Sequence, residues 1–258
     1  MASFPHLTVF VLGLIVGSFL NVVIYRYNTG RSVARGRSRC LACSRNLHWF
    51  ELVPVASFIA LRGRCRRCLS GISWQYPLVE LVTGLLFLLA SWQFGINPAS
   101  WPLLAVYLVI LSLLVVITVY DFRHKIIPDG LVYAFIIFSI LPVLFTREGV
   151  IIFNHLLAGL ALFAFFFLLW AVSRGRWMGF GDAKLALGVG FLLGLTGGVS
   201  AIVFAFWFGA LVSVCVLIYG QLSGRAKFGL KSEVPFAPFI VLGLFLNLFF
   251  HLNVIALF

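Results

Sequence analysis

LLAVYLVILSLLVVITVY, residues 103–120, is the stretch that decides the fold, because it is long and apolar enough to cross a bilayer and ends directly at Asp121. A membrane-spanning helix needs about 20 mostly apolar residues. This stretch belongs to a predicted span at 101–120, and seven comparable runs lie at 6–25, 77–94, 130–146, 151–172, 183–197, 199–219 and 236–257. Only the predicted turn at Gly197-Gly198 separates the sixth run from the seventh, so seven spans is the alternative to eight.

The composition favours the same architecture. Of the 258 residues, 62% are hydrophobic and 10% are charged, whereas a soluble domain keeps about a quarter of its residues charged. We therefore expect an all-α polytopic membrane protein with about eight transmembrane helices. Residues 1–25 carry no basic residue ahead of their apolar run, so they are expected to form a first span and not a cleaved signal peptide. Residues 26–73 are expected to form a small insert, and residues 74–258 a membrane core of about seven helices.

The net charge of +12 would suit a nucleic-acid partner, but the distribution of the charges points to membrane topology instead. Of the 19 basic residues, 18 fall in alternate connections between the predicted spans: Arg26, Arg31, Arg35, Arg37, Arg39, Arg45, Arg62, Arg64, Arg66, Arg67, Arg123, Lys125, Arg174, Arg176, Lys184, Arg225, Lys227 and Lys231. Only Arg147 lies on the other side. Basic loops stay cytoplasmic. The sequence therefore predicts a membrane protein with both termini outside the cytoplasm and the insert inside it, and no nucleic-acid partner.

Four of the five cysteines lie in the insert as two CxxC pairs, Cys40 with Cys43 and Cys65 with Cys68. The pairs are 21 residues apart, slightly more than in the usual zinc ribbon. Each pair can supply two thiolates to a tetrahedral Zn²⁺. Disulfides and free thiols are the alternatives, and a reducing cytosol disfavours disulfides. A closed site with four cysteine ligands would make the zinc structural.

Acidic residues are scarce in this chain, and two of its seven fall at matching depths. Asp121 closes the third predicted span, and Asp182, in GFGD at 179–182, opens the sixth, so the topology brings both to the cytoplasmic end. Two carboxylates that share a site can divide the work of an aspartic protease, one protonated and one ionised. The alternative is that each is an ordinary helix-end residue, with Asp182 as an N-terminal cap and Asp121 paired with Arg123 or Lys125.

Three glutamates have other expected roles. Glu80 lies about one turn inside the second predicted span, where a charge needs a partner, and a lysine or arginine is the expected one. Glu51 and Glu148 lie in loops and are expected to be solvated.

Six segments, in order along nearly the whole chain, resemble the bacterial type IV prepilin peptidase family, a family of GxGD aspartic proteases. They are GSFLNVVIYR at 17–26, the two CxxC pairs with RGRC at 62–65, YPLVE at 76–80, DFRHKIIPD at 121–129, GFGDAK at 179–184 and VPFAPF at 234–239. Two positions depart from the family pattern: Gln75 stands where the family often has Arg, and Ala237 where Gly is usual.

The resemblance implies that Asp121 and Asp182 are the catalytic pair of an endopeptidase that removes prepilin leaders. It also implies methylation of the new N-terminus with S-adenosylmethionine, type IV prepilin and pseudopilin substrates, and a role in type IV pili or type II secretion. With the predicted topology, the resemblance implies a bacterial inner-membrane protein whose termini are periplasmic. The residues that bind this cofactor are not identified by the sequence. Possible site-lining residues are Gly179, Gly181, Lys184, Glu80 and Asp129. The competing hypotheses are a transporter that uses the carboxylates as a proton relay and a non-catalytic scaffold.

Overall fold

The computed structural model describes residues 3–30, 32–146, 148–222 and 234–254. Within these ranges the regular structure is helical, and the only β pairing is two isolated bridges, Arg39 with Asn46 and Arg64 with Gly71. The predicted all-α class is therefore confirmed. Five basic residues used in the sequence analysis lie outside the described residues: Arg31, Arg147, Arg225, Lys227 and Lys231.

Five of the described helices are long and apolar enough to cross a membrane. They are α1 (Ser3–Arg26), α3 (Gln75–Phe94), α4 (Trp101–His124), α6 (Gly149–Ser173) and α7 (Phe180–Leu222). Two shorter apolar helices, α5 (Asp129–Leu144) and α8 (Ala237–Phe250), correspond to the fourth and eighth predicted spans. In a bilayer a helix satisfies its own backbone hydrogen bonds, which is why apolar runs of this length fold this way. The chain is a polytopic membrane protein.

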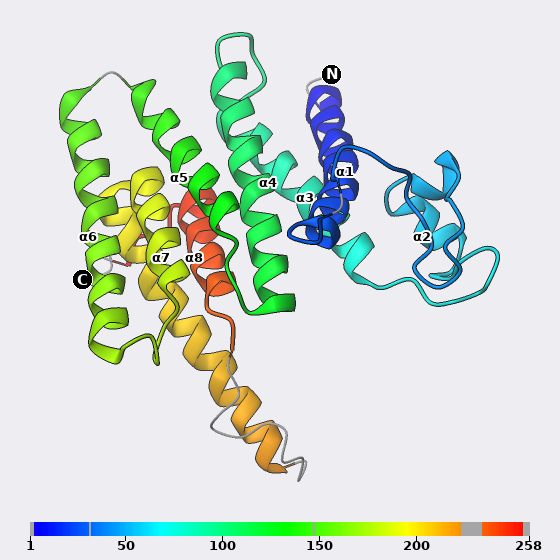
Figure 1. The fold of residues 1–258 in the computed structure, drawn as a ribbon. Coiled ribbons are helices and arrows are strands. Elements are labelled where there is room, and N and C mark those ends of the chain that lie inside the picture. Colours follow the sequence, from blue (N-terminus) through cyan, green and yellow to red (C-terminus); the bar gives the residue numbers. More distant parts are fainter. Residues whose placement is uncertain (1–2, 31, 147, 223–233, 255–258) are drawn as a thin grey trace. The chain divides into compact units, whose positions relative to one another are not determined.

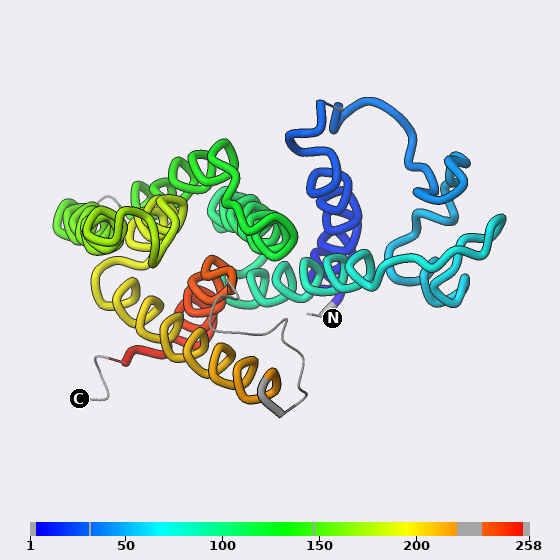
Figure 2. Tube along the Cα trace, turned by 60° about the horizontal axis from the view of Figure 1, so that its bottom comes forward, coloured from blue at the N-terminus to red at the C-terminus, as the bar shows by residue number. Residues whose placement is uncertain are grey.

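The sixth and seventh predicted spans form one element, α7, which is interrupted at Gly194 (φ 71°, ψ −173°). The expected turn at Gly197-Gly198 is wrong, because both residues are helical. These two glycines serve close packing instead: a Cβ at Gly197 would lie 2.7 Å from Oδ1 of Asn247, and one at Gly198 would lie 2.9 Å from Leu162. The direction of α7 changes along its length (Figures 1 and 2).

The chain forms two compact units, residues 1–116 and 117–258. In the first unit, α1 packs on α3 through small residues, as GxxxG-like spacing permits. A Cβ at Gly13 would lie 2.8 Å from the Cα of Gly84, and one at Gly17 would lie 2.7 Å from the Cα of Glu80. The insert between these helices contains a short 3₁₀ helix (Trp49–Leu52) and a five-residue helix, α2 (Ala56–Ala60).

In the second unit, α7 packs against α5, α6 and α8. Glycines again allow close approach: Gly190 faces Gly159 of α6, and Gly243 of α8 lies against the backbone of Ala201. Aromatic rings join the same helices, with Phe166 of α6 stacked on Phe206 of α7 at a centroid distance of 6.2 Å. This close packing holds the start of α7, where Asp182 lies, in place among α5, α6 and α8.

Candidate functional site

Asp121 lies in the last turn of α4, and its side chain is buried, with 4% of the residue exposed. The helix stops after His124 because Lys125 adopts a left-handed conformation (φ 53°). The backbone N–H of Lys125 still donates to the carbonyl of Asp121 at 2.7 Å. The Asp121 carboxylate interacts with the backbone N–H of Ala237 at the start of α8, while its Oδ2 atom is buried with no hydrogen-bond partner among the described residues. Because a buried polar atom is rarely left unpaired, this oxygen is available to a proton, a water molecule or a substrate.

Asp182 is the third residue of α7, and 6% of it is exposed. Its Oδ2 atom accepts a hydrogen bond from the backbone N–H of Gly179 at 3.2 Å, and its own N–H donates to the Gly179 carbonyl at 3.2 Å. The side chain thus bonds back to the residue before the helix. Asp182 has a helix-end role, but at the third helical position and not as the expected N-terminal cap. The carboxylates of Asp121 and Asp182 also lie close enough to interact electrostatically. Two carboxylates in such an arrangement can share a proton.

The two predicted site-lining glycines differ in their surroundings. Gly181 packs tightly on the connection between α4 and α5, because a Cβ there would lie 2.8 Å from the Cβ of Ile127. At Gly179 the nearest atom would be Oδ2 of Asp182, at an ordinary contact distance of 3.5 Å. Gly181 therefore sets how closely the segment carrying Asp182 approaches the segment that follows Asp121. No sequence pattern indicated that Ile127 packs against Gly181.

Lys184 and Asp129, two more of the predicted site-lining residues, contact each other. Nζ of Lys184 lies 2.6 Å from Oδ1 of Asp129, the first residue of α5. The ammonium group also lies over the rings of Tyr133 and Phe180, at 5.1 and 4.9 Å from their centroids. The pair therefore joins the first turns of α5 and α7. Glu80, the remaining predicted site-lining residue, belongs to the first unit.

The four insert cysteines lie on two turns that repeat the same backbone pattern. In the first turn, the N–H of Cys40 donates to the Arg45 carbonyl at 2.9 Å, and the Cys40 carbonyl accepts from the N–H of Ser44, also at 2.9 Å. Cys65 repeats this with Ser70 and Leu69, at 2.9 and 3.0 Å. Ser44 and Leu69 occupy the same place in their turns, and both have positive φ, 55° and 57°. The two CxxC pairs are thus presented as equivalent halves of one cluster.

The geometry of the cluster fits a tetrahedral metal ion. All four Sγ atoms lie within 4.8 Å of one another, and those of Cys40 and Cys68 are 3.8 Å apart. Four sulfurs at about 2.3 Å from a central Zn²⁺ would be about 3.8 Å apart along each edge. This donor set can hold a metal, as the sequence predicted, and with four cysteines around it no coordination position would remain open.

Backbone donors in these turns favour a thiolate at Cys40. The backbone N–H of Cys43 is the main cause that lowers the pKa of the Cys40 thiol to about 6, and Ser70 contributes. The Ser70 hydroxyl also lowers the pKa of Cys68. At Cys43 the Arg45 backbone acts in the lowering direction, but desolvation and the neighbouring thiols raise its pKa to about 11. Because a metal binds thiolates, occupation of the cluster would release protons.

Two glutamates differ from the sequence-based expectation. Glu51 is buried, not solvated, and pairs with Arg45; it also accepts from His48 N–H at 2.8 Å. Burial alone would raise the pKa of Glu51, but the hydrogen bonds from His48 and Arg45 hold it below its usual range. The partners of Glu80 in the described residues are the Val55 backbone N–H, at 2.8 Å, and the Ser18 hydroxyl, not the expected cation.

Comparison with known proteins places these features in a family. A model of the bacterial peptidase A24 N-terminal domain matches residues 11–94, and a model of the type IV leader peptidase family matches residues 108–214. The chain is 34% identical over 238 residues to the prepilin leader peptidase/N-methyltransferase of Bacillus subtilis, a match that covers 91% of this chain and 90% of the relative.

A protein of the same name from Myxococcus xanthus is 39% identical over 222 residues, 84% of this chain but 64% of the relative's length. The type 4 prepilin-like proteins leader peptide-processing enzyme of Escherichia coli is 31% identical over 265 residues, 94% of this chain and 92% of the relative. No solved structure matches the chain. Together the family models and these relatives show that the chain belongs to the type IV leader peptidase family.

Proposed function

We propose that this chain is an aspartic endopeptidase of the membrane that removes the leader of type IV prepilin-like proteins and then N-methylates the new N-terminus. The observation that supports it best is the meeting of Asp121 and Asp182, which are 61 positions apart in sequence, as buried and electrostatically interacting carboxylates at two helix ends. The relatives named above are prepilin leader peptidases/N-methyltransferases, which agrees with this chemistry.

In the proposed mechanism one carboxylate takes a proton from a water molecule while the other, protonated, donates to the oxygen of the scissile carbonyl. The hydroxyl adds to the carbonyl carbon, and the C–N bond breaks as the leaving nitrogen receives a proton. Gly179 N–H holds one oxygen of Asp182, and Ala237 N–H interacts with Asp121, so the backbone orients both groups. Oδ2 of Asp121, which has no hydrogen-bond partner among the described residues, is the oxygen that would bind the water or the carbonyl.

We place the pair at the cytoplasmic end of the spans and the insert in the cytoplasm, with both termini periplasmic, on the basis of the basic connections. A prepilin with a basic leader and an apolar helix would then present its scissile bond at this boundary. Pilins and the pseudopilins of type II secretion are the proposed substrates, and no nucleic-acid partner is proposed.

We assign the cysteine cluster to structural Zn²⁺ held by Cys40, Cys43, Cys65 and Cys68. Its role would be to fix the two turns of the insert, because an ion with four protein ligands has no position for substrate. S-adenosylmethionine would supply the methyl group for the second activity.

The protease assignment is tested by Asp121→Asn and Asp182→Asn, each co-expressed in membranes with a prepilin whose mass is then measured. Each variant should abolish leader removal, because the remaining carboxylate cannot serve as both acid and base. Glu148→Gln, which removes an exposed carboxylate, is the matched control and should process normally. Full processing by either aspartate variant would overturn the assignment. A proton-coupled uptake activity that the parent chain has and these variants lose would favour the transporter alternative.

The zinc assignment is tested by the metal content of the purified chain. Cys43→Ser should lose most of its zinc, whereas Cys215→Ser, which lies on α7 and is not one of the four clustered cysteines, should keep it. An unchanged zinc content in Cys43→Ser would contradict the four-cysteine site.

A further inference from the structure

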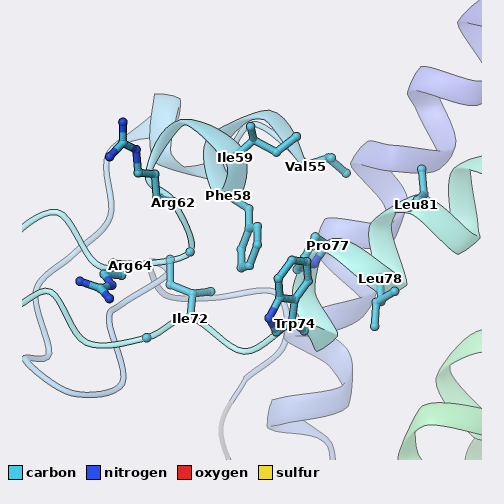
Figure 3. A pocket seen from close by; sticks show the side chains of 12 residues that line it. Val55, Phe58, Ile59, Arg62, Arg64, Ile72, Trp74, Pro77, Leu78 and Leu81 are labelled. Carbon is cyan, nitrogen blue, oxygen red and sulfur yellow. The ribbon is translucent and has the colours of Figure 1, made fainter.

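A cavity of about 570 Å³ lies in the first unit, between the insert and the start of α3. Its walls come from α2, from the second cysteine turn and from the first two turns of α3. The ring of Phe58 meets that of Trp74 at a centroid distance of 4.9 Å, and Ile72 lies beside them (Figure 3). Cavities of this size commonly hold small organic ligands.

The lining of this cavity changes character from one end to the other. Figure 3 shows Arg62 and Arg64 at one end, on the insert, and Leu78 and Leu81 at the opposite end, on α3. The 12 lining residues include these two cations and no carboxylate. Such a lining is complementary to an amphiphile with an anionic head and an apolar tail.

The apolar end is continuous with the membrane. Leu78 and Leu81 belong to α3, one of the candidate spans, and are 55% and 40% exposed, so they offer apolar surface to lipid tails in a bilayer. Trp74, 70% exposed, stands immediately before this span, where indole rings favour the bilayer interface. The cavity therefore opens toward the level at which lipid phosphates lie.

We propose that this cavity binds an anionic phospholipid, with its phosphate on Arg62 and Arg64 and an acyl chain along Leu78 and Leu81. Guanidinium groups bind phosphate through paired, charge-assisted hydrogen bonds. The two arginines disfavour a cationic methyl donor in the same space, since nothing in the lining offsets its sulfonium charge.

The lipid would couple the insert to the bilayer. Gly71 and Arg64, which line the cavity, are bridged to each other and flank Cys65 and Cys68, so the metal cluster shapes one wall. Lipid at the other wall would hold α2 against the start of α3. This site goes beyond the proposed protease and does not depend on it.

The test measures binding of phosphatidylglycerol to the purified full chain by native mass spectrometry, with phosphatidylcholine as the zwitterionic comparison. Arg62→Gln combined with Arg64→Gln should weaken phosphatidylglycerol binding about tenfold or more. Each basic side chain near a lipid phosphate raises the binding constant a few-fold. Arg35→Gln with Arg37→Gln removes the same charge from exposed positions of the same insert outside the cavity and should change binding less than twofold.

A second variant blocks the space without touching the charges. Gly71→Phe should exclude the lipid, because Gly71 lines the cavity and a Cβ there would meet no atom within 4 Å, which leaves space for the ring. If both double arginine variants lose the same amount of phosphatidylglycerol binding, the effect comes from the net charge of the insert and the proposed site is wrong. Displacement of the lipid by S-adenosylmethionine or by inorganic phosphate alone would also overturn it, in favour of a cofactor or a simple anion site.

Discussion

Nζ of Lys184 lies 2.6 Å from Oδ1 of Asp129, so that the second residue after Asp182 is tied to the first residue of α5. The two side chains differ in exposure, 11% for Lys184 and 64% for Asp129. Asp129 ends the nine-residue segment that begins at Asp121. The ion pair therefore links the two segments that carry the proposed catalytic carboxylates, and the rings of Tyr133 and Phe180 hold the ammonium group in place.

Breaking this pair should slow prepilin cleavage without abolishing it. A partly exposed ion pair contributes about 1 kcal/mol at most, so Asp129→Asn and Lys184→Met should each lower kcat/KM about fivefold. The loss should fall mainly on kcat if the pair positions Asp182. Exchanging the charges, with Asp129→Lys and Lys184→Asp together, should restore part of the rate. Unchanged kinetics in both single variants would show that the pair has no positioning role.

The two glycines of the GFGD segment should respond differently to alanine. Gly181→Ala places a Cβ 2.8 Å from the Cβ of Ile127, so the α4–α5 connection must move away from α7. Overpacking of this kind typically costs about 1–3 kcal/mol, and cleavage should fall at least tenfold. Gly179→Ala meets only an ordinary contact and should retain most activity. Equal rates for the two variants, measured on one prepilin, would contradict this geometry.

The spans and the cysteine turns could be predicted from the sequence because each depends on local pattern. An apolar run such as 103–120 has one low-energy form in a bilayer, and CxxC spacing predisposes the chain to a metal turn. The break in α7 could not be placed in this way. Consecutive glycines at 197–198 signal a turn, yet Asn247 and Leu162 require small residues there, while the interruption lies at Gly194.

The hydrogen-bond partners of the buried carboxylates likewise could not be predicted from the sequence. The position of Glu80 within a span predicted a cationic partner, but its carboxylate accepts a hydrogen bond from the N–H of Val55. Val55 is 25 positions away in sequence and has an unusual positive φ of 59°. The partner of Asp121, Ala237, lies in the VPFAPF segment, which the sequence had singled out only by resemblance. Which backbone group a buried side chain bonds to depends on how the helices pack, and a local sequence pattern does not determine that packing.

Glu80 should act as an anchor between α3 and the insert. Glu80→Ala leaves the Val55 N–H without its acceptor, and an unsatisfied buried donor costs about 1–3 kcal/mol. The insert should then become more open to limited proteolysis around α2, by roughly the corresponding five- to hundredfold in rate. Glu80→Gln retains an oxygen acceptor and should behave nearly as the parent chain. Equal protease resistance in Glu80→Ala would show that water or another residue replaces the carboxylate.

The interruption at Gly194 should depend on two neighbouring residues of α6. Oδ1 of Asn154 accepts a hydrogen bond from Leu195 N–H at 3.0 Å, and Nδ1 of His155 lies 2.9 Å from the Phe191 carbonyl. These are backbone groups that a continuous helix would satisfy by itself, and a bilayer offers few substitutes.

Asn154→Ala should therefore lower the stability of the purified chain by about 1–2 kcal/mol, or about 2–8 °C in Tm for a chain of this length. Thr8→Ala, which removes an exposed hydroxyl bonded to the Pro5 carbonyl within α1, is the control and should shift Tm by less than about 1 °C. Asn154→Ala combined with His155→Ala should destabilise more than either alone, since each leaves a different backbone group without its partner. A Tm equal to that of the parent chain in the double variant would mean that water satisfies the backbone groups at the break.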